Sequence, residues 1–448
     1  YRDSGGELWI GSWEEGLFHV KTDGKIENFK YDAKNPHSLS SNFVRACCED
    51  NLGNIWIGTF NGLNRYNKST GLFQNHTAND IQSDGLTHSS IWCIVKDNQG
   101  TLWLGTYFGG VNYFNPEYEI YTRYSYSSNE KQGLSNPVVG RTIEDKNGNL
   151  WIGTEGGGLN YFNRRTREFK WYRPQEGRNS ISHNNVKALY YDADKEIIWI
   201  GTHLGGLNRL DIRSGHFTHY RMEDNNRQTL PSDIVRDIIP YKDLLIVATQ
   251  NGVCLFEPDS GKCRQLFKDS KEGKSIKMVA DILLDSESTL WIAATGEGVF
   301  SYRFDTRKLT NYRHDSANPN SLSNNNVNNI MQDSQGHLWF STSGSGLDLY
   351  HPANNDFENF DKEKNGLASD CVYETQESAA SGKLLLITNQ GFSIFDYQNM
   401  HIKNYSAENG FPLTAVNENS LCITRDGEIF LGGVQGMISF HEMELNFT

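Results

Sequence analysis

The sequence predicts an all-β fold built from repeated four-stranded sheets, and three observations support this prediction. A motif of the type Leu-Trp-Ile-Gly-Thr recurs through the 448 residues with a period of 45 to 48. Each repeat contains short runs of β-branched and aromatic residues separated by turn residues. The 3.6-residue periodicity of an amphipathic helix is absent over any useful length. The ten repeat centres are Trp9, Trp56, Trp103, Trp151, Trp199, Ile246, Trp291, Trp339, Leu385 and Phe430.

Residues 84–126 illustrate how one repeat is organised. Residues 90–95 form a first apolar run, and the turn at 97–100 contains an Asp and a Gly, which suit tight turns. Residues 102–104 and 111–114 form the next two strands, and residues 120–124 alternate as a fourth strand would. Four antiparallel strands with turns at the corners form one blade of a β-propeller. The sequence therefore predicts ten four-stranded blade repeats.

The Trp of each repeat is interpreted as a packing residue. It falls at the same phase of the same strand each time, where neighbouring blades stack. A ladder of Trp residues that stack on sugars is the alternative, but regular repetition is what a core demands. The acids Asp50, Asp97, Asp145 and Asp333 also recur at one turn position, which indicates a structural role.

The two ends of the repeat array predict two propellers. The first repeat lacks its innermost strand, and no clear fourth strand follows residues 436–440. A propeller often completes its last blade with a strand from its own beginning, which hides both sheet edges, and residues 119–126 could supply that strand. We therefore expect residues 1–116 to be the last three blades of an N-terminal propeller and residues 117–448 to be a closed seven-bladed propeller. A single ten-bladed ring is the rival arrangement.

Composition excludes several classes of protein. The formal net charge is −13 and no basic stripe is present, which argues against binding to nucleic acid or to an anionic membrane surface. The apolar runs are too short to cross a bilayer, so we expect any membrane anchor to lie outside this sequence, which we interpret as a fragment or a processed chain. Most of the seven cysteines fall in strands as small hydrophobic residues, although Cys254 and Cys263 flank a turn and could form a disulfide. No metal site or cofactor is predicted.

Further elements accompany the Trp motif. Residues 320–323 read Asn-Ser-Leu-Ser, residues 148–154 read Gly-Asn-Leu-Trp-Ile-Gly-Thr, and residues 157–160 read Gly-Gly-Leu-Asn. Over essentially the whole chain, these elements resemble the two-component regulator propeller repeat, which builds the sensor regions of hybrid two-component systems in gut Bacteroidetes.

The resemblance implies a periplasmic sensor domain, part of an inner-membrane protein, that binds oligosaccharide breakdown products of a complex polysaccharide and promotes polysaccharide utilisation. It also implies an immunoglobulin-like domain, a membrane helix and a histidine kinase later in the same polypeptide. The full-length protein is expected to be a homodimer.

Catalytic signatures do not favour an enzyme. The sequence contains no nucleophile elbow, phosphate-binding loop or His-Glu-x-x-His motif. A propeller glycosidase needs two carboxylates across the scissile bond, and among 55 acidic residues the sequence alone cannot single out such a pair. A propeller hydrolase or lyase, or a protein-interaction scaffold, is the alternative to the sensor.

The candidate ligand site lies in the loops that surround the central opening of a propeller. Arg45, Trp92, Lys187, Arg236 and Asn328 follow the Val or Ile of a first strand, Arg141 lies one residue further on, and Tyr107 and His203 occupy second-to-third strand loops. Guanidinium groups suit bidentate capture of carboxylate or sulfate. We expect an anionic oligosaccharide to bind Arg141, Lys187 and Arg236, with Trp92 or Tyr107 stacking on a sugar ring. Alternatively, the cations pair with carboxylates such as Asp237 or Glu144, or are solvated.

Overall fold

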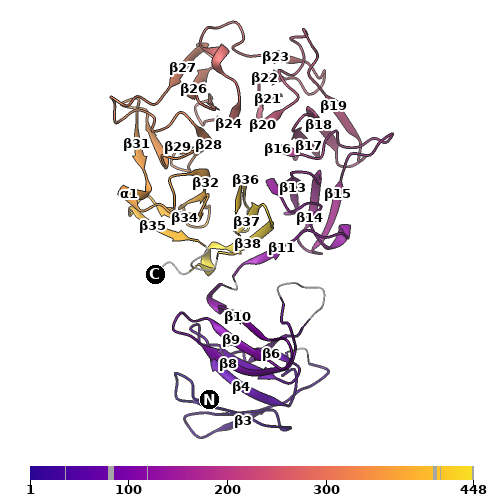
Figure 1. The fold of residues 1–448 in the computed structure, drawn as a ribbon. Coiled ribbons are helices and arrows are strands. Elements are labelled where there is room, and N and C mark those ends of the chain that lie inside the picture. Colours follow the sequence, from indigo (N-terminus) through magenta and orange to yellow (C-terminus); the bar gives the residue numbers. More distant parts are fainter. Residues whose placement is uncertain (36, 79–84, 119, 407–410, 414, 446–448) are drawn as a thin grey trace. The chain divides into compact units, whose positions relative to one another are not determined.

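A computed structural model describes residues 1–35, 37–78, 85–118, 120–406, 411–413 and 415–445. These residues form two compact units, Tyr1–Ile120 and Tyr121–Thr448 (Figure 1). Both units consist of antiparallel β-sheets, which confirms the all-β propeller prediction. Within the described ranges, no helix is long and apolar enough to cross a membrane.

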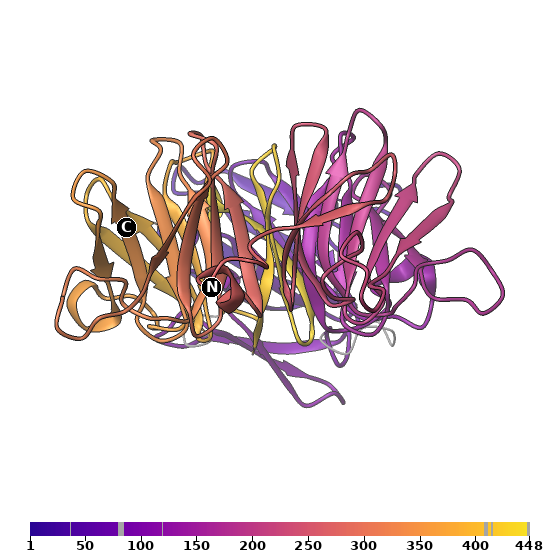
Figure 2. The same ribbon diagram turned by 90° about the horizontal axis from the view of Figure 1, so that it is seen from above.

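The C-terminal unit is a ring of seven four-stranded sheets, which we call blades 1 to 7 in chain order (Figure 1). Each inner strand contacts the inner strand of the next blade, and the inner strand of blade 7 contacts that of blade 1, so the ring is closed. Figure 2 shows the ring edge-on, with the strands running between its two faces. One short helix, α1 (Lys362–Asn365), follows blade 5.

The strands of the seven blades are listed here from the inner to the outer edge. Blade 1 comprises β12 (Val139–Glu144), β13 (Leu150–Thr154), β14 (Leu159–Asn163) and β15 (Glu168–Tyr172); blade 2 comprises β16 (Val186–Asp192), β17 (Ile197–Thr202), β18 (Leu207–Asp211) and β19 (Phe217–Tyr220); blade 3 comprises β20 (Val235–Tyr241), β21 (Leu244–Thr249), β22 (Gly252–Phe256) and β23 (Cys263–Gln265). Blade 4 comprises β24 (Val279–Leu284), β25 (Thr289–Ala294), β26 (Gly298–Arg303) and β27 (Lys308–Tyr312); blade 5 comprises β28 (Val327–Gln332), β29 (Leu338–Thr342), β30 (Leu347–His351) and β31 (Asp356–Phe360). Blade 6 comprises β32 (Val372–Glu377), β33 (Leu384–Thr388), β34 (Gly391–Asp396) and β35 (His401–Tyr405); blade 7 comprises β36 (Val416–Ile423), β37 (Glu428–Gly433), β38 (Gly436–His441) and β11 (Thr122–Tyr124).

Blade 7 closes the ring because it combines strands from both ends of this unit. β11 pairs antiparallel with β38, with Arg123 opposite Ile438. The pairing falls within residues 119–126, the segment that the sequence suggested for this role; residue 119 lies outside the described residues. A shared core of Tyr124, Val139, Phe162, Phe430 and Met437 then fills the seam between blades 7 and 1.

Charged side chains also connect blades 7 and 1 at the protein surface. Arg164, which directly follows β14, donates from Nη2 to Asp426 Oδ2 at 2.7 Å and to Glu428 Oε2 at 2.6 Å. Arg425 Nη2 donates in the opposite direction to the carbonyl oxygen of Asp145 at 2.6 Å. The side chains of Arg164 and Glu428 are 17% and 18% exposed, so this ion pair is largely shielded from water, whereas Asp426 is more exposed.

We expect Arg164→Ala to lower the free energy of unfolding of the C-terminal unit by about 1–2 kcal/mol, because a half-buried arginine with two carboxylate partners is lost. Arg303→Ala is the matched control: it removes the same charge, but the exposed ion pair of Arg303 with Asp305 joins only the end of β26 to the turn that follows it. That control should change the free energy by less than about 0.5 kcal/mol. Urea denaturation at low salt measures both, and equal losses would contradict a role in ring closure.

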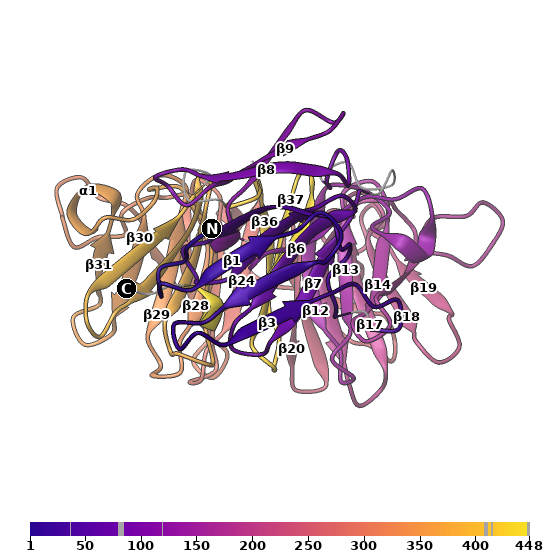
Figure 3. The same ribbon diagram turned by 90° about the horizontal axis from the view of Figure 1, so that it is seen from below.

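The N-terminal unit contains three sheets (Figure 3). The first comprises β1 (Leu8–Gly11), β2 (Leu17–Val20) and β3 (Ile26–Phe29); the second comprises β4 (Val44–Glu49), β5 (Ile55–Thr59), β6 (Gly62–Asn67) and β7 (Leu72–His76); the third comprises β8 (Ile91–Lys96), β9 (Leu102–Thr106) and β10 (Val111–Phe114). In the described residues, the first sheet therefore lacks an inner strand, as expected. The interpretation of residues 120–124 as the fourth strand of the third sheet is wrong, because residues 122–124 pair with β38 instead.

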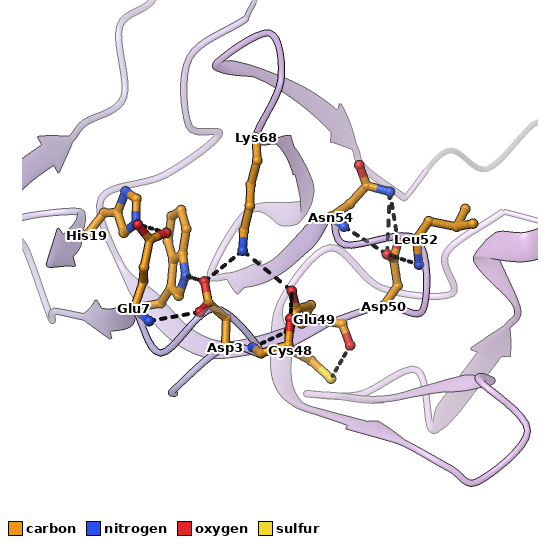
Figure 4. Close-up of polar contacts among 11 residues, drawn as sticks. Asp3, Glu7, His19, Cys48, Glu49, Asp50, Leu52, Asn54 and Lys68 are labelled. Atoms are coloured by element: carbon orange, nitrogen blue, oxygen red, sulfur yellow. Dashed lines mark hydrogen bonds and ion pairs between the residues drawn. The ribbon is translucent and has the colours of Figure 1, made fainter. Parts of the chain in front are cut away.

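A repeated contact explains the conserved spacing of Asp and Trp within the chain. Figure 4 shows the turn at Asp50, where Oδ1 accepts hydrogen bonds from the backbone N–H groups of Leu52 and Asn54, both at 2.9 Å. The other carboxylate oxygen, Oδ2, accepts a hydrogen bond from Trp56 Nε1 at 2.7 Å. The same Asp–Trp bond joins Asp3 to Trp9, Asp97 to Trp103, Asp285 to Trp291 and Asp333 to Trp339. Asp145 accepts from the backbone N–H groups of Asn147 and Asn149, but Trp151 Nε1 has no partner among the described residues. The acids at this turn position are therefore structural, as the sequence indicated.

The cysteines also have a structural role. All seven, each within the described residues, are free thiols, so the disulfide considered between Cys254 and Cys263 is not formed. Both thiols are buried in one core that joins blades 2 and 3. The hydrogen bond with Cys263, together with burial, raises the pKa of Cys254 well above its ordinary value, so this thiol is held in its protonated form.

Candidate functional site

A β-bulge near the start of each inner strand prepares the site. In β16, β20, β24, β28 and β32 the register shifts by one residue directly after the first Val. A bulge re-aims the extra side chain away from the regular ladder. The residues that follow these valines, and those that follow Val139 and Val416, are therefore placed around the axis of the ring.

A central cavity of about 90 Å³, partly open to solvent, lies at this level of the ring. Blades 1 to 5 and blade 7 contribute to its wall. The lining residues are Gly140, Arg141, Glu155, Val186, Lys187, Arg236, Ala280, Asn328, Asn417, Glu418 and Asn419. Four residues that the sequence singled out, Arg141, Lys187, Arg236 and Asn328, thus line one cavity.

The three cations of the cavity differ in how well they are paired. Lys187 Nζ donates to Glu155 Oε1 at 2.6 Å. Arg141 Nη2 lies 3.6 Å from Asp237 Oδ1, which is beyond hydrogen-bond distance, and Arg141 Nε and Nη2 are buried without hydrogen-bond partners. Arg236 has no hydrogen-bond or ion-pair partner among the described residues. The alternative that carboxylates neutralise these cations therefore holds for Lys187, holds in part for Arg141 and fails for Arg236.

Lys187 and Arg236 also shift the pKa values of titratable residues near the cavity. Burial favours the neutral form of Glu155, but the hydrogen bond and charge of Lys187 outweigh it and lower the pKa of Glu155. Burial, followed by the charges of Lys187 and Arg236, lowers the pKa of His203. His203 is therefore neutral at pH 7, close to two cations, and its Nδ1 is buried without a partner.

Asn328 is held in place by its neighbours. Its Nδ2 donates to the carbonyl oxygen of Val372 at 2.8 Å, and its Oδ1 accepts from Ser343 Oγ at 2.6 Å. Both ends of the amide are therefore already in use, so Asn328 shapes the wall more than it offers free hydrogen-bonding groups. Glu144, which was considered as a partner for the cluster, instead pairs with Arg425 at 3.3 Å.

A belt of buried polar side chains lies beneath the cavity wall, and sequence reasoning missed it. We define the belt as the residues two positions after the first Val of blades 1 to 6: Arg141, Ala188, Asp237, Asp281, Asn329 and Glu374. Four of them accept a backbone N–H from the next blade: Asp237 from Ile282 at 3.4 Å, Asp281 from Ile330 at 2.7 Å, Asn329 from Thr375 at 2.9 Å and Glu374 from Leu421 at 3.1 Å. The belt thus ties each inner strand to its neighbour. The signal in the sequence was a polar residue two positions after Val in successive repeats.

Burial raises the pKa of two acidic residues of the belt. Burial, and then the charge and hydrogen bond of Asp237, raise the pKa of Asp281 well above its ordinary value. Burial also raises the pKa of Glu374. Burial opposes the charge of Arg141, but the carboxylates of Asp237, Glu374 and Asp281 raise the pKa of this guanidinium, which therefore stays charged.

The other three predicted site residues belong to the N-terminal unit and form a cluster of their own. The Arg45 guanidinium lies 3.9 Å from the ring centroid of Trp92 and 4.7 Å from that of Phe60. Tyr107 stacks on Trp92 with ring centroids 5.6 Å apart. Trp92 and Tyr107 are half-exposed. These residues belong to the N-terminal unit, whereas Arg141, Lys187 and Arg236 line the cavity of the C-terminal unit.

The cavity wall is rich in cationic and amide donors. Among the described residues, no group of three or more His, Cys, Asp or Glu side chains could hold a metal ion. The wall instead combines guanidinium, ammonium and amide groups in a recess with little apolar surface. The fold and the cavity define a β-propeller protein with a polar, cation-lined recess on the axis of its ring.

Comparison with known proteins gives the family of the repeats. Residues 38–61, 85–108, 133–156 and 321–344 match the model of the two-component regulator propeller. Each match covers an inner strand and the strand that follows it. Four segments of this β-propeller chain are therefore similar to the two-component regulator propeller repeat. No curated protein matches the chain.

Solved structures show the same fold. The extracellular domain assigned to the hybrid two-component system BT3049 of B. thetaiotaomicron is 24% identical, with a TM-score of 0.67 over 98% of this chain and 61% of that one. The corresponding domain of BT4673 is 19% identical, with a TM-score of 0.61 over 100% of this chain and 64% of that one. Streptogramin B lyase, 13% identical, has a TM-score of 0.52 over 71% of this chain and 96% of the lyase. The chain spans less than two thirds of the two extracellular domains.

Proposed function

We propose that this chain is the ligand-binding part of a periplasmic sensor of a hybrid two-component system, and that its central cavity binds an anionic oligosaccharide derived from a complex polysaccharide. The observation that carries the proposal is the Arg236 guanidinium, which lines the cavity without a partner among the described residues. Arg141, with two unpartnered buried nitrogens, adds a second donor in the same wall.

The charge balance supports an anionic ligand. The protein as a whole carries a net charge of −13, yet the cavity wall contains three cations and two carboxylates. Glu155 already neutralises Lys187, so the remaining guanidinium groups face the recess with spare donors. Guanidinium is the side-chain group best suited to bidentate binding of carboxylate or sulfate. A neutral sugar would leave those donors without a charged acceptor.

The comparisons support the wider context of the proposal. The two extracellular domains that share this fold are assigned to hybrid two-component systems, and this chain spans 61–64% of their length. We therefore propose that residues 1–116 are the last blades of a preceding propeller and that the full-length protein is anchored in the inner membrane. In the same proposal, an immunoglobulin-like domain and a histidine kinase follow in the polypeptide, and the full-length protein is a homodimer without enzymatic activity.

Calorimetry of the purified chain with matched neutral and acidic oligosaccharides tests the binding site. We expect Arg236→Ala to weaken binding of the acidic ligand at least tenfold, equivalent to about 1.4 kcal/mol or more, without changing the melting temperature. Arg178→Ala is the matched control, because it removes the same charge from an exposed position outside the cavity.

Other outcomes have distinct meanings. Equal affinity of the wild type and Arg236→Ala would remove the cavity from the proposal. A loss of affinity in Trp92→Ala would locate binding in the aromatic cluster of the N-terminal unit instead. Cleaved products in the calorimeter cell would show an enzyme rather than a sensor.

A further inference from the structure

A recess at the junction of blades 3 and 4, which we call the lysine recess, has a volume of about 320 Å³. It lies between the loop that joins β21 to β22 and the loop that joins β23 to β24, and it shares no lining residue with the central cavity. Lys268, Lys274 and Lys277 line it, and no Asp or Glu is among the described residues of its wall. The central cavity, by contrast, has Glu155 and Glu418 beside its cations. The lysine recess is therefore strongly cationic in a chain whose net charge is −13.

The three lysines are accessible and have no opposite charge bound to them. Each of them is exposed, and within the described ranges none of them forms an ion pair. The two acids of the same loop do not compensate them: Asp269 pairs with Arg227 at 3.2 Å, and Glu272 does not line the recess. Because like charges around one recess repel one another, a bound anion would be favoured there.

The ammonium group of Lys268 is held in position by the scaffold. Its Nζ donates to Gln265 Oε1 at 2.7 Å, and Gln265 Nε2 donates in turn to the carbonyl oxygen of Thr229 at 3.1 Å. These two hydrogen bonds connect the ammonium to the backbone. Since an ammonium group has further N–H donors, Lys268 is oriented and still has donors available for a ligand.

Lys274 and Lys277 belong to a tightly packed turn. Gly273 precedes them, and its backbone N–H donates to Ser270 Oγ at 2.8 Å. A Cβ at this position would clash with the backbone oxygen of Phe267, so the turn leaves no room for a side chain there. Ile276, between the two lysines, is buried in the core that joins blades 3 and 4. The backbone that carries both lysines is therefore fixed on either side.

Comparison with blade 2 indicates that the scaffold does not require a lysine at position 277. In the loop before blade 2, the residue after the buried aliphatic side chain is Ser182, which donates from its N–H to Asn208 Oδ1 at 2.9 Å and accepts from Asn208 Nδ2 at 2.6 Å. Lys277 follows the buried Ile276 in the same way. Phe300 takes the place of Asn208 in blade 4. A hydrogen-bonded pair that supports blade 2 is thus replaced by a cation and an apolar residue.

Lys274 departs from the repeat in the same manner. Residues 179–181 read Asn-Ser-Ile, and residues 274–276 read Lys-Ser-Ile. Asn179 holds the backbone of Phe217, because its Nδ2 donates to the carbonyl oxygen at 2.8 Å and its Oδ1 accepts from the N–H at 2.6 Å. A lysine has no acceptor and cannot replace this pair of bonds. Two of the three cations therefore occupy positions that serve the scaffold in blade 2.

We propose that the lysine recess is a second ligand site, which binds a phosphate or sulfate group. An ammonium group is a compact point charge with rotatable donors, so three of them can each approach a different oxygen of a tetrahedral anion. A planar carboxylate is matched better by the fork of a guanidinium group, and no arginine lines this recess among its described residues. This inference concerns a separate recess and does not rest on binding at the central cavity.

Calorimetric titrations with glucose 6-phosphate, glucose 6-sulfate and uncharged glucose test the site. We expect both anionic sugars to saturate a single site per chain in the Arg236→Ala variant, in which the central cavity lacks its unpaired guanidinium, and glucose to give no saturable heat. Sedimentation with vesicles of equal parts phosphatidylglycerol and phosphatidylcholine distinguishes a lipid phosphate from a soluble one. Absence of binding to every one of these probes would overturn the inference and leave the proposed function to its own test.

Substitutions within the recess add a second test. Lys277→Ser and Lys274→Asn introduce the residues found before blade 2, and each should weaken binding about tenfold or more, because a charge-assisted hydrogen bond is lost. Lys195→Ser is the matched control, since it removes the same charge from an exposed position that does not line the recess. Equal weakening by all three would show a general effect of net charge and contradict a specific site.

Hydrogen exchange of the wild-type chain locates the ligand without any substitution. We expect glucose 6-phosphate to slow exchange of the backbone amides within residues 266–277, which form the wall of the lysine recess. Protection confined to the inner strands around the central cavity would place the anion there and refute the second site. This measurement also decides the question if a lysine variant fails to fold.

Discussion

Trp56→Ala should lower the free energy of unfolding of the N-terminal unit by about 3–5 kcal/mol, the cost of removing a fully buried indole from a packed core. Trp56 has no exposed surface and contacts Leu63, Ile91 and Leu102 within one core. The substitution also leaves Asp50 Oδ2 without the Trp56 hydrogen bond of 2.7 Å. Guanidinium or urea denaturation followed by circular dichroism measures the change.

Trp103→Ala is the matched control in the same unit. Trp103 occupies the same position of the repeat and donates to Asp97 at 2.8 Å, so both variants lose an equivalent hydrogen bond. Trp103, however, is 42% exposed, and we expect its removal to cost about 1–2 kcal/mol, since less apolar area returns to water. The difference between the variants isolates packing between blades. Equal losses would mean that the Asp–Trp bond, rather than burial, gives the Trp its importance.

Asp348→Asn should stabilise the C-terminal unit by about 2–3 kcal/mol at pH 7. Asp348 is fully buried in blade 5, and burial raises its pKa to about 6. Between pH 4 and 6 the folded protein therefore holds a proton that the unfolded chain releases, so the contribution of this carboxyl is full below about pH 4 and is lost as the pH rises through 6. The gain from Asn should be small at pH 4 and reach its maximum above pH 7.

Other blades show why Asn fits this position. Asn208, at the same place in blade 2, accepts from the backbone N–H of Ser182 at 2.9 Å and donates to Ser182 Oγ at 2.6 Å. Asp348 retains the first bond, from Ser323 N at 2.8 Å, and its Oδ1 accepts from Asn359 Nδ2 at 2.8 Å. The ionised carboxylate cannot donate, and Ser323 Oγ is buried without a partner. Asn208→Asp is the reverse control and should destabilise the unit increasingly above pH 4. Melting temperatures of both variants across pH 4–8 provide the measurement, and a pH-independent difference would refute the assignment.

Much of the fold could be predicted because its determinants are local. The six-residue spacing from Asp50 to Trp56 places an Asx-type turn and an indole N–H within reach of one carboxylate. The phase of the Trp motif also predicted which residues follow the bulge, so Lys187, Arg236 and Asn328 could be named as wall residues of a central opening. A period-2 strand pattern and turn chemistry depend only on neighbours in sequence.

The other features of the site could not be predicted from local sequence patterns. Glu155 and Asn417 lie 262 residues apart yet meet in one cavity wall, with Asn417 Nδ2 at 3.5 Å from Glu155 Oε1. The sequence also did not show that the predicted site residues are divided between two units. Trp92 and Arg236 have the same register in their repeats, but they belong to separate units. The sequence does not reveal that Asp348 replaces an Asn at a buried position, because the unpartnered Ser323 Oγ is a property of the folded chain.

The sequence by itself determined the blade repeat, the structural role of the turn acids and several of the residues that face an axis, because each follows from spacing within one repeat. Tertiary structure alone decided that residues 122–124 pair with β38 and not with the third sheet, and that Asn417 and Asn419 join Arg141 and Arg236 in one cavity wall. These features depend on distances across the ring. Such distances are set by the number of blades and by the strand that closes the ring, and no single repeat contains that information.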